Sequence, residues 1–133
     1  FEISKKIDGE LVLGATRMAF ERRGYPKGVI HHSDRGVQYL CDKHVQFLKE
    51  NKFKISCAAK GNPYENAFAE SFMKTLKNDQ VDLFKYATII DVIENVPEFL
   101  EEVYNKKRLH SSLNYLTPEE FEAKCIKKNR ARP

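Results

Sequence analysis

The stretch VIHHSDRG, residues 29–36, decides the fold, because it has the pattern of a short strand that ends in a carboxylate and a glycine-containing turn. The expected strand covers residues 29–33, and Asp34 follows it directly. A second stretch, FKISCA at residues 53–58, alternates apolar with polar side chains, as a half-buried strand does. Helical patterns flank both strands. Strands that alternate with helices predict an α/β layer with parallel pairing.

Capping residues and periodicity place the expected helices. Asp8 is suited to cap a first helix, and Gly24 is suited to end it. A second helix is expected over residues 42–51. Helical periodicity returns over residues 64–81, and a further helix is expected over residues 91–107.

The C-terminal part of the chain contains a strong helix-start signal, TPEE at residues 117–120. Thr117 can cap the helix, Pro118 suits its first position, and Glu120 can complete a capping box. A basic tail follows at residues 126–133, for which we predict disorder. The expected division is therefore one partial domain over residues 1–125 and a disordered tail.

Composition limits the class of protein. The 133 residues are enough for one domain with its own core, and the net charge of +4 is compatible with a nucleic-acid partner without identifying one. No apolar run reaches roughly 18 residues, so we expect no membrane partner. The three cysteines form no CxxC pair, which argues against a zinc ribbon or a disulfide framework and favours a reducing, cytoplasmic compartment.

Two carboxylates are candidates for chemistry, and each also has an ordinary structural explanation. Asp34 follows a strand end, where α/β folds place ligand-binding groups, but aspartates there also commonly cap turns. Glu70 shares a helical face with Lys74 and Lys77, four and seven residues later. A solvated face with a Glu70–Lys74 ion pair would explain that pattern equally well. Considered singly, both residues favour the ordinary explanation.

The order of four longer stretches changes that balance. They are HSDRGVQY at residues 32–39, GNPYENAFAESF at 61–72, YNKKRLHSSL at 104–113 and TPEEF at 117–121. Together they resemble the integrase core (DDE) domain of bacterial insertion-sequence transposases, a group related to retroviral integrases. Thirty-five residues lie between Asp34 and Glu70, and Lys77 is the basic residue seven positions after the Glu, as in the family pattern.

The resemblance implies a ribonuclease H-like fold and a metal-dependent activity that cleaves DNA and transfers its strands. The family pattern has three carboxylates, of which Asp34 and Glu70 match the second and the third. The first lies on an upstream strand, which Asp8, as a helix cap, does not match. We therefore expect a chain truncated on its N-terminal side and inactive alone. Three strands are expected, with residues 1–4 as the end of the first, and with helices on both faces of the sheet.

The cofactors and partners are implied by the same resemblance. Two Mg²⁺ or Mn²⁺ ions would be held in the intact enzyme by Asp34, Glu70 and the first aspartate, which bridges both ions. The partner would be DNA, both transposon ends and target, and the protein would be a homo-oligomer in the bacterial cytoplasm, associated with the nucleoid. The residues expected to bind DNA are Lys60, Asn62, Tyr64, Lys74, Lys77, Arg108 and His110. For Arg108 and His110, tying the last helices to the core is an alternative.

Other interpretations stay open. The chain could be a non-catalytic fragment of a decayed element that only binds DNA or a sister subunit. A ribonuclease or resolvase of the same fold fits less well, because the spacing and the C-terminal signature are those of transposases. His31 and His32 are successive strand residues that point to opposite faces, so they cannot both line one site. We expect packing for His31 and a structural or DNA-proximal role for His32.

Overall fold

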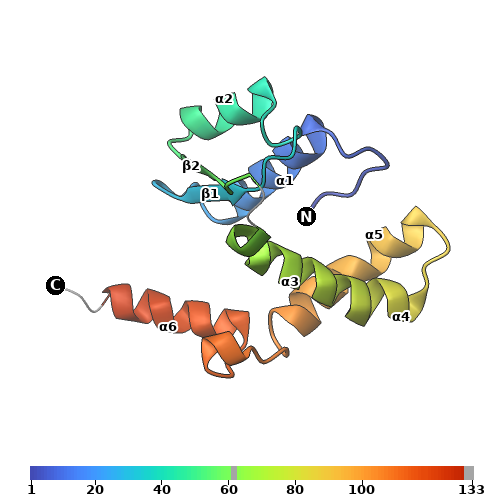
Figure 1. Cartoon of the computed structure of the whole chain (residues 1–133). Coiled ribbons are helices and arrows are strands. Elements are labelled where there is room, and N and C mark those ends of the chain that lie inside the picture. The colour runs from blue at the N-terminus through green and yellow to red at the C-terminus, as the bar shows by residue number, and fades with distance from the viewer. Residues whose placement is uncertain (61–62, 131–133) are drawn as a thin grey trace. The chain divides into compact units, whose positions relative to one another are not determined.

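The computed structural model of the chain describes residues 1–60 and 63–130. The chain divides into two compact units, residues 1–73 and residues 74–133, each of which is described by itself. Figure 1 shows the helices and strands in chain order. No helix in the described part of the chain is long and apolar enough to cross a bilayer.

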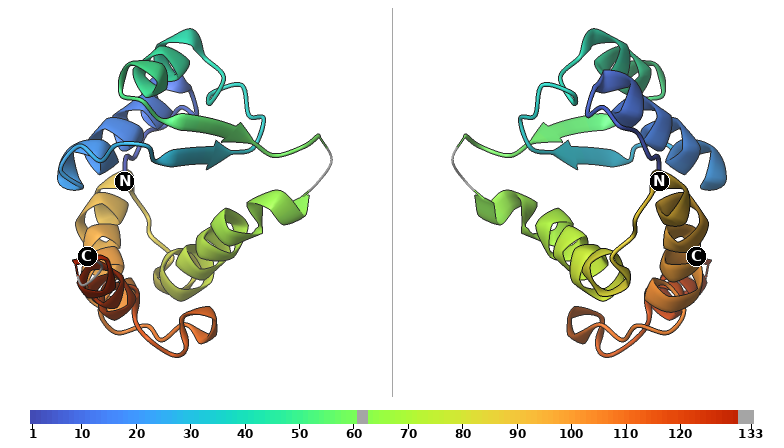
Figure 2. Two further views of the ribbon diagram at one scale, coloured as in Figure 1. Left: turned by 90° about the vertical axis from the view of Figure 1, so that its left-hand side faces the viewer. Right: turned by 90° about the vertical axis from the view of Figure 1, so that its right-hand side faces the viewer.

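The first unit is built on a parallel pair of strands. It contains α1 (Gly9–Arg22), β1 (Ile30–Ser33), α2 (Asp42–Glu50), β2 (Lys54–Cys57) and the 3₁₀ turn η1 (Pro63–Asn66). The strands pair in parallel, with Ile30 opposite Lys54 and Ser33 opposite Cys57 (Figure 2). Helix α2 packs against both α1 and β2. The α/β class and the parallel pairing expected from the sequence are confirmed.

Aromatic and aliphatic side chains from α1, from α2 and from the residue before β2 form the core of this unit. Leu13 and Phe20 of α1 are buried, as is Leu48 of α2, which is 1% exposed. The Phe20 ring lies 5.3 Å from that of Phe53 and 5.9 Å from that of Phe47, between ring centroids. Burying side chains of this size stabilises a fold by roughly 1.5–3 kcal/mol each, so these contacts fix α1 and α2 beside the strands.

Residues 1–4 form no strand, which corrects the expectation of a third strand. The sheet has two strands in the described residues, β1 and β2. The N-terminal segment instead contacts α1: the Phe1 ammonium lies 3.6 Å from the sulfur of Met18, and the Glu2 carboxylate lies close to Gly14. A strand needs a neighbouring backbone for its hydrogen bonds. Residues 1–4 contact helix α1 rather than a strand backbone.

The second unit is helical, and α3 crosses the boundary between the units. The elements are α3 (Ala67–Leu76), the π-helical turn η2 (Lys77–Val81), α4 (Asp82–Phe84), α5 (Ile89–Glu98), the π-helical segment η3 (Phe99–Tyr104), the 3₁₀ turn η4 (Ser111–Leu113) and α6 (Pro118–Arg130). The helix expected over residues 64–81 thus begins later and ends in a π turn. The helix expected over 91–107 also changes to π geometry. Pro97, which lacks an amide proton, lies just before that change.

The expected helix starts are confirmed by their hydrogen bonds. Asp8 accepts from the Leu11 amide at 3.1 Å. At the start of α6, the Glu120 amide donates to Thr117 Oγ1 at 3.2 Å, and the Thr117 amide donates to Glu120 Oε2 at 3.0 Å. These two reciprocal bonds are the predicted capping box.

Helix α6 runs to Arg130 and so includes residues 126–130 of the basic tail, whose disorder stays a prediction. Lysine and arginine are good helix formers, so the basic composition that suggested disorder is also compatible with continuing a capped helix. The last part of the expected tail, residues 131–133, lies outside the described residues.

Candidate functional site

Asp34 lies where the sequence places it, immediately after β1. Ser33 is buried and Asp34 is exposed. One carboxylate oxygen of Asp34, Oδ1, accepts from the Gly36 amide at 2.8 Å, and the Gly36 carbonyl accepts from the Tyr39 amide at 3.0 Å. The turn-capping role is therefore present. It occupies one carboxylate oxygen, and an exposed aspartate has a second oxygen with which to bind a ligand.

The ends of the two strands are tied together beside Asp34. The Arg35 guanidinium donates through Nε to the Ala58 carbonyl at 3.1 Å, and the Ala58 amide donates to the Ser33 carbonyl at 2.9 Å. The carboxyl edge of a parallel sheet is where α/β folds bind ligands. Asp34 is thus held at that edge by a turn and a neighbouring cross-strand contact.

A fully buried histidine, His44 of α2, contacts the segment that follows Asp34. Its Nδ1 lies 2.9 Å from the Tyr39 carbonyl oxygen, and its Nε2 lies 3.2 Å from Thr16 Oγ1 of α1. A carbonyl oxygen only accepts hydrogen bonds, so Nδ1 carries a proton. His44 therefore connects α1 to the loop that follows Asp34.

The Thr16 hydroxyl that meets His44 is also held by its own helix. It donates to the Val12 carbonyl oxygen at 2.8 Å, and its oxygen lies 3.2 Å from His44 Nε2. The contact between His44 and α1 is thus made to a hydroxyl that α1 itself orients.

His31 and His32 behave as expected for successive strand residues. The His31 ring packs edge-on against His44, with centroids 5.0 Å apart. Burial lowers the pKa of His31, and the neighbouring His44 lowers it further. His32 is exposed, and its Nδ1 lies 2.9 Å from Ser56 Oγ on β2. The packing role of His31 and the structural role of His32 are both confirmed.

Tyr39 contacts the histidine pair through its ring and lies within electrostatic reach of Asp34. Burial raises the pKa of Tyr39, and the negative charge of Asp34 raises it further. The Tyr39 ring lies 6.3 Å from the rings of both His31 and His44, between centroids. Sequence reasoning missed His44, although its position four residues before Leu48 places it on the apolar face of α2.

Glu70 is exposed on α3. Within the described residues it makes no ion pair with Lys74, so that explanation for the spacing of the two charges has no support. The separation between the carboxylates of Glu70 and Asp34 stays a prediction.

Asp34 and Glu70 are the side chains expected to bind the metal ions. No group of three His, Cys, Asp or Glu side chains suited to a metal ion occurs in the described ranges 1–60 and 63–130. Mg²⁺ prefers oxygen ligands and commonly uses one or two carboxylates together with waters and substrate phosphates. Asp34 and Glu70 therefore fit the ion by donor type and exposure.

The residues expected to bind DNA fall in different parts of the chain. In the first unit Lys60 is exposed, and Tyr64 is 86% exposed beside a turn in which Glu65 Oε2 accepts from the Ala59 amide at 2.7 Å. Lys74 and Lys77 are exposed in the second unit. The expectation for Asn62 lies outside the described residues. DNA contacts by these side chains stay predictions.

Arg108 and His110 make structural contacts within the second unit. Arg108 forms an ion pair with Asp79 of η2. The His110 ring packs on Tyr104 with centroids 5.1 Å apart, and its backbone pairs with Leu116. Burial lowers the pKa of His110, and the charge of Arg108 lowers it further. These contacts are of the kind that the tying role requires, and DNA contacts by both residues stay predictions.

Comparisons with known proteins agree with these motifs. Two family descriptions, both of an integrase core domain, match residues 51–118 and residues 1–63. A transposase of insertion sequence IS904 from Lactococcus lactis is 33% identical over 122 residues, which are 92% of this chain and 48% of the relative.

Two further relatives come from enteric bacteria. An uncharacterized 31 kDa protein of insertion element IS600 from Shigella sonnei is 35% identical over 124 residues, 93% of this chain and 46% of the relative. The transposase InsF of insertion sequence IS3A from Escherichia coli is 35% identical over 126 residues, 95% of this chain and 44% of the relative. The chain thus spans about half the length of the curated relatives it matches.

Proposed function

Since this chain belongs to the integrase core domain family, we propose that it contributes Asp34 and Glu70 to the catalytic centre of a DNA transposase. The observation that carries this proposal is the exposed Asp34 at the carboxyl edge of the parallel sheet, with Glu70 exposed on α3 at the family spacing. The transposases among the relatives, which cover nearly the whole chain, support it.

Asp34 and Glu70 would hold Mg²⁺ or Mn²⁺ in the assembled centre. Such ions polarise a phosphodiester and stabilise the charge that develops on its attacking and leaving oxygens. The protein's own part is to keep the ligands in place. The hydrogen bond from the Gly36 amide orients Asp34, and His44 holds the loop behind it. Residues that fix catalytic groups in this way reduce the reorganisation that the reaction requires.

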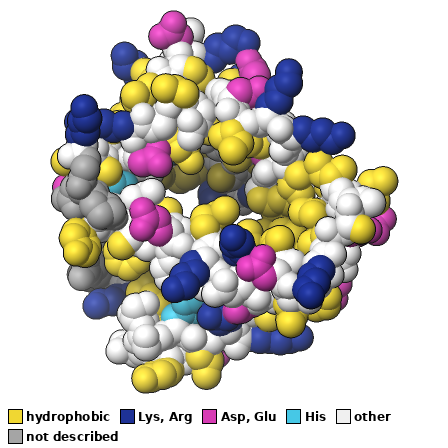
Figure 3. Space-filling model, turned by 45° about the vertical axis from the view of Figure 1, so that its right-hand side comes forward, with side chains coloured by type: hydrophobic (Ala, Val, Ile, Leu, Met, Phe, Trp, Pro, Cys, Tyr) yellow, Lys and Arg dark blue, Asp and Glu magenta, His cyan; other side chains and the backbone are white. Residues whose placement is uncertain are grey.

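DNA is the proposed substrate and partner, and exposed lysines would bind its phosphates. Lys60 lies in the first unit, and Lys74 and Lys77 lie in the second. On the face shown in Figure 3, Lys and Arg side chains are interspersed with Asp and Glu. Contacts of this kind bind DNA with little sequence preference, and they weaken as salt displaces them.

A DNA-joining assay with Mg²⁺ or Mn²⁺ tests the proposal. It compares the chain alone with a version extended upstream through a strand that carries the family's first aspartate. We expect joining by the extended version only, and we expect Asp34→Asn or Glu70→Gln to abolish it. Each of these substitutions removes a charged ligand and should raise the activation free energy by several kcal/mol. The rate falls about tenfold for each 1.4 kcal/mol.

The matched control is Asp42→Asn, which removes an exposed carboxylate at the start of α2. It should leave joining unchanged. Joining that survives both Asp34→Asn and Glu70→Gln would contradict the proposal. DNA binding without joining by the extended version would favour the non-catalytic alternative.

A further inference from the structure

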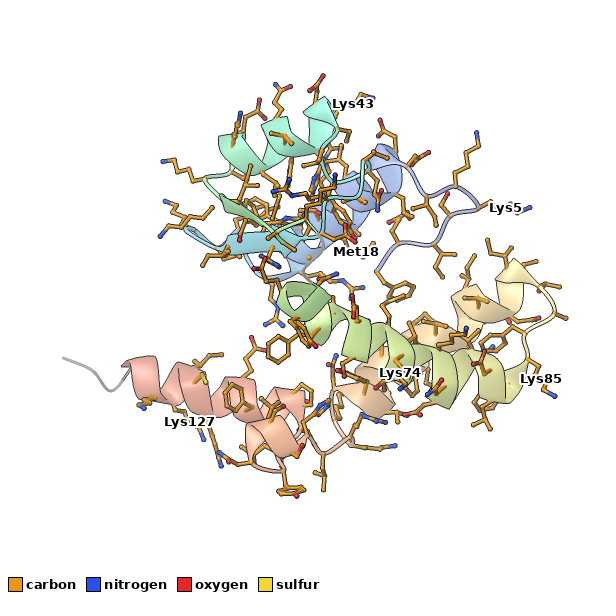
Figure 4. All side chains as sticks on the ribbon, viewed as in Figure 1. Lys5, Met18, Lys43, Lys74, Lys85 and Lys127 are labelled. Atoms are coloured by element: carbon orange, nitrogen blue, oxygen red, sulfur yellow. The ribbon has the colours of Figure 1, made fainter. Side chains whose placement is uncertain are left out.

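The helix that carries Glu70 is followed directly by a π-helical turn, whose first residue is Lys77. Helix α3 ends at Leu76, the turn η2 covers Lys77–Val81, and α4 begins at Asp82. Figure 4 labels Lys74, three residues before the turn, and Lys85, just after α4. Single π turns inside helices are rare and occur frequently at functional sites. Because the turn contains an extra residue, it changes the direction of the side chains around it.

Two tertiary contacts hold this turn from its inner side. The carboxylate of Asp79 forms an ion pair with the Arg108 guanidinium, 29 residues later in the chain. Gln80 is 7% exposed and donates a hydrogen bond through Nε2 to the Tyr86 hydroxyl. Lys77, two residues before Asp79, is exposed. In this turn Gln80 is buried, Asp79 is half-exposed in its ion pair with Arg108, and Lys77 is exposed to solvent.

We propose that the Asp79–Arg108 ion pair fixes the π turn so that Lys77 faces a DNA phosphate, and that Arg108 is a positioning residue rather than a DNA contact. This inference rests on the proposed function. The nearby Asp79 carboxylate offsets the positive charge of Arg108 and occupies part of its guanidinium, whereas Lys77 is exposed and forms no ion pair among the described residues. Arginine suits the pairing role because its planar fork matches a carboxylate.

The direction in which Asp79→Asn changes the affinity for DNA distinguishes a positioning role from simple electrostatic attraction. Asp79→Asn removes a negative charge, so electrostatics alone would make the chain bind DNA more tightly. If the ion pair positions Lys77, the same substitution weakens binding instead. Glu102→Gln is the matched control, because Glu102 also forms an ion pair, with Lys106 at 2.7 Å, and lies in η3 away from the π turn. Its substitution changes the net charge equally.

The measurement is the affinity of the full chain for a duplex of mixed sequence at two salt concentrations. Between about 50 and 200 mM salt, one phosphate contact accounts for roughly a threefold fall in affinity. We therefore expect Asp79→Asn to bind more weakly at the lower salt concentration and to lose about threefold less affinity than the unaltered chain when salt is raised, like Lys77→Ala. Glu102→Gln should bind equally or slightly more tightly, with an unchanged salt dependence. The double variant Asp79→Asn/Lys77→Ala should be no weaker than Lys77→Ala alone, because both changes remove the same contact.

Tighter binding by Asp79→Asn, or additive losses in the double variant, would overturn the positioning role. Amide hydrogen exchange of residues 78–82 provides a readout that does not depend on DNA. It should accelerate in Asp79→Asn and remain unchanged in Glu102→Gln. Failure of the unaltered chain to bind DNA would reject the proposed function and the DNA role of Lys77 together. If amide hydrogen exchange is unchanged in Asp79→Asn, the ion pair does not stabilise the turn, and the inference is rejected whatever the DNA measurements show.

Discussion

His44 connects three segments of the first unit through two hydrogen bonds and through ring contacts with His31 and Tyr39. It reaches Thr16 on α1, the Tyr39 carbonyl behind Asp34, and the His31 ring on β1. The side chain is 0% exposed, so each of its polar atoms needs a partner inside the protein. The polar contacts of one buried residue therefore support the turn that presents Asp34.

We expect His44→Ala to lower the free energy of unfolding by about 2–4 kcal/mol, because it leaves a cavity and removes the partner of the buried Tyr39 carbonyl. Urea denaturation measures this change. The control is Gln46→Ala on the exposed face of the same helix, which should cost less than 1 kcal/mol or so. Equal losses in the two variants would show that the His44 contacts contribute nothing specific.

The depressed pKa of His31 makes stability depend on pH. Burial favours the neutral ring, and the neighbouring His44 does so as well, so the unfolded chain binds a proton more readily than the folded chain. Stability therefore rises with pH in this range. The contribution is complete above the ordinary histidine pKa of about 6.5 and is lost as pH falls toward the lower pKa of the folded state.

The test replaces His31 by Phe and follows the free energy of unfolding from pH 7 to pH 5. The ionisable groups packed against His31 are His44 and Tyr39, and the adjacent His32 on the opposite face has a smaller effect on its pKa. We expect the unaltered chain to lose stability on acidification and His31→Phe to lose less. An identical pH dependence in both proteins would contradict the assignment.

At the scale of elements, side-chain caps mark the starts of α1, α5 and α6. Thr117 is buried and forms both reciprocal bonds of the capping box with Glu120. Thr88 and Asp91 form the same arrangement at the start of α5, where the Thr88 amide donates to Asp91 Oδ2 at 2.9 Å. These hydrogen bonds to Asp91 lower its pKa.

We expect Thr117→Ala to lower the free energy of unfolding by about 1 kcal/mol, the usual cost of losing an N-cap side chain. Thermal unfolding measures the change, and Thr117→Ser should restore most of it, because serine keeps the hydroxyl. The exposed Lys124→Ala on α6 provides a control with little expected effect. A Thr117→Ser variant as unstable as Thr117→Ala would show that the hydroxyl is not the stabilising group.

Local chemistry accounts for the elements that the sequence predicted correctly. Asp8, Thr117 and the alternation over residues 53–58 act through neighbours close in the chain, so the sequence alone reveals them. The π turn η2 depends on Asp79 meeting Arg108, which is distant in the sequence. Residues 1–4 have a strand pattern, but a strand also needs a partner, and local sequence does not specify one.

In the candidate site, too, the sequence predicts residues recognised by local motifs but not contacts between distant segments. Asp34 and Glu70 were identified by their spacing and surrounding motifs, and the position of Asp34 at a strand end is confirmed. The role of His44 was missed because its partners, Thr16 and Tyr39, come from other segments of the first unit. Arg108 was left with two possible roles, since a basic residue in a motif can bind either DNA or a carboxylate.

At the scale of the whole molecule, the two-stranded sheet is narrow and carries exposed apolar side chains. Ile30 of β1 is 63% exposed and Ile55 of β2 is 42% exposed. Unpaired strand edges with apolar side chains favour pairing with another backbone. We therefore predict self-association of the chain through these strands.

Sedimentation velocity over a range of protein concentrations measures this association. We expect a dimer that grows with concentration, and we expect Ile30→Lys to shift the protein toward the monomer, because a charge blunts an exposed edge. The control is Ile126→Lys, an exposed apolar side chain on α6. A monomer at all concentrations, or equal effects of the two lysines, would contradict association through the sheet.

The central claim is that Asp34 and Glu70 serve one metal-dependent centre. A crystal structure of the chain grown with Mn²⁺ and a short DNA duplex tests it most directly, through the distance between the two carboxylates. Ions about 4 Å apart with ligands about 2 Å from each require carboxylates within roughly 4–9 Å on one surface. We predict a distance in that range. Carboxylates that point to opposite faces of the sheet would contradict the claim.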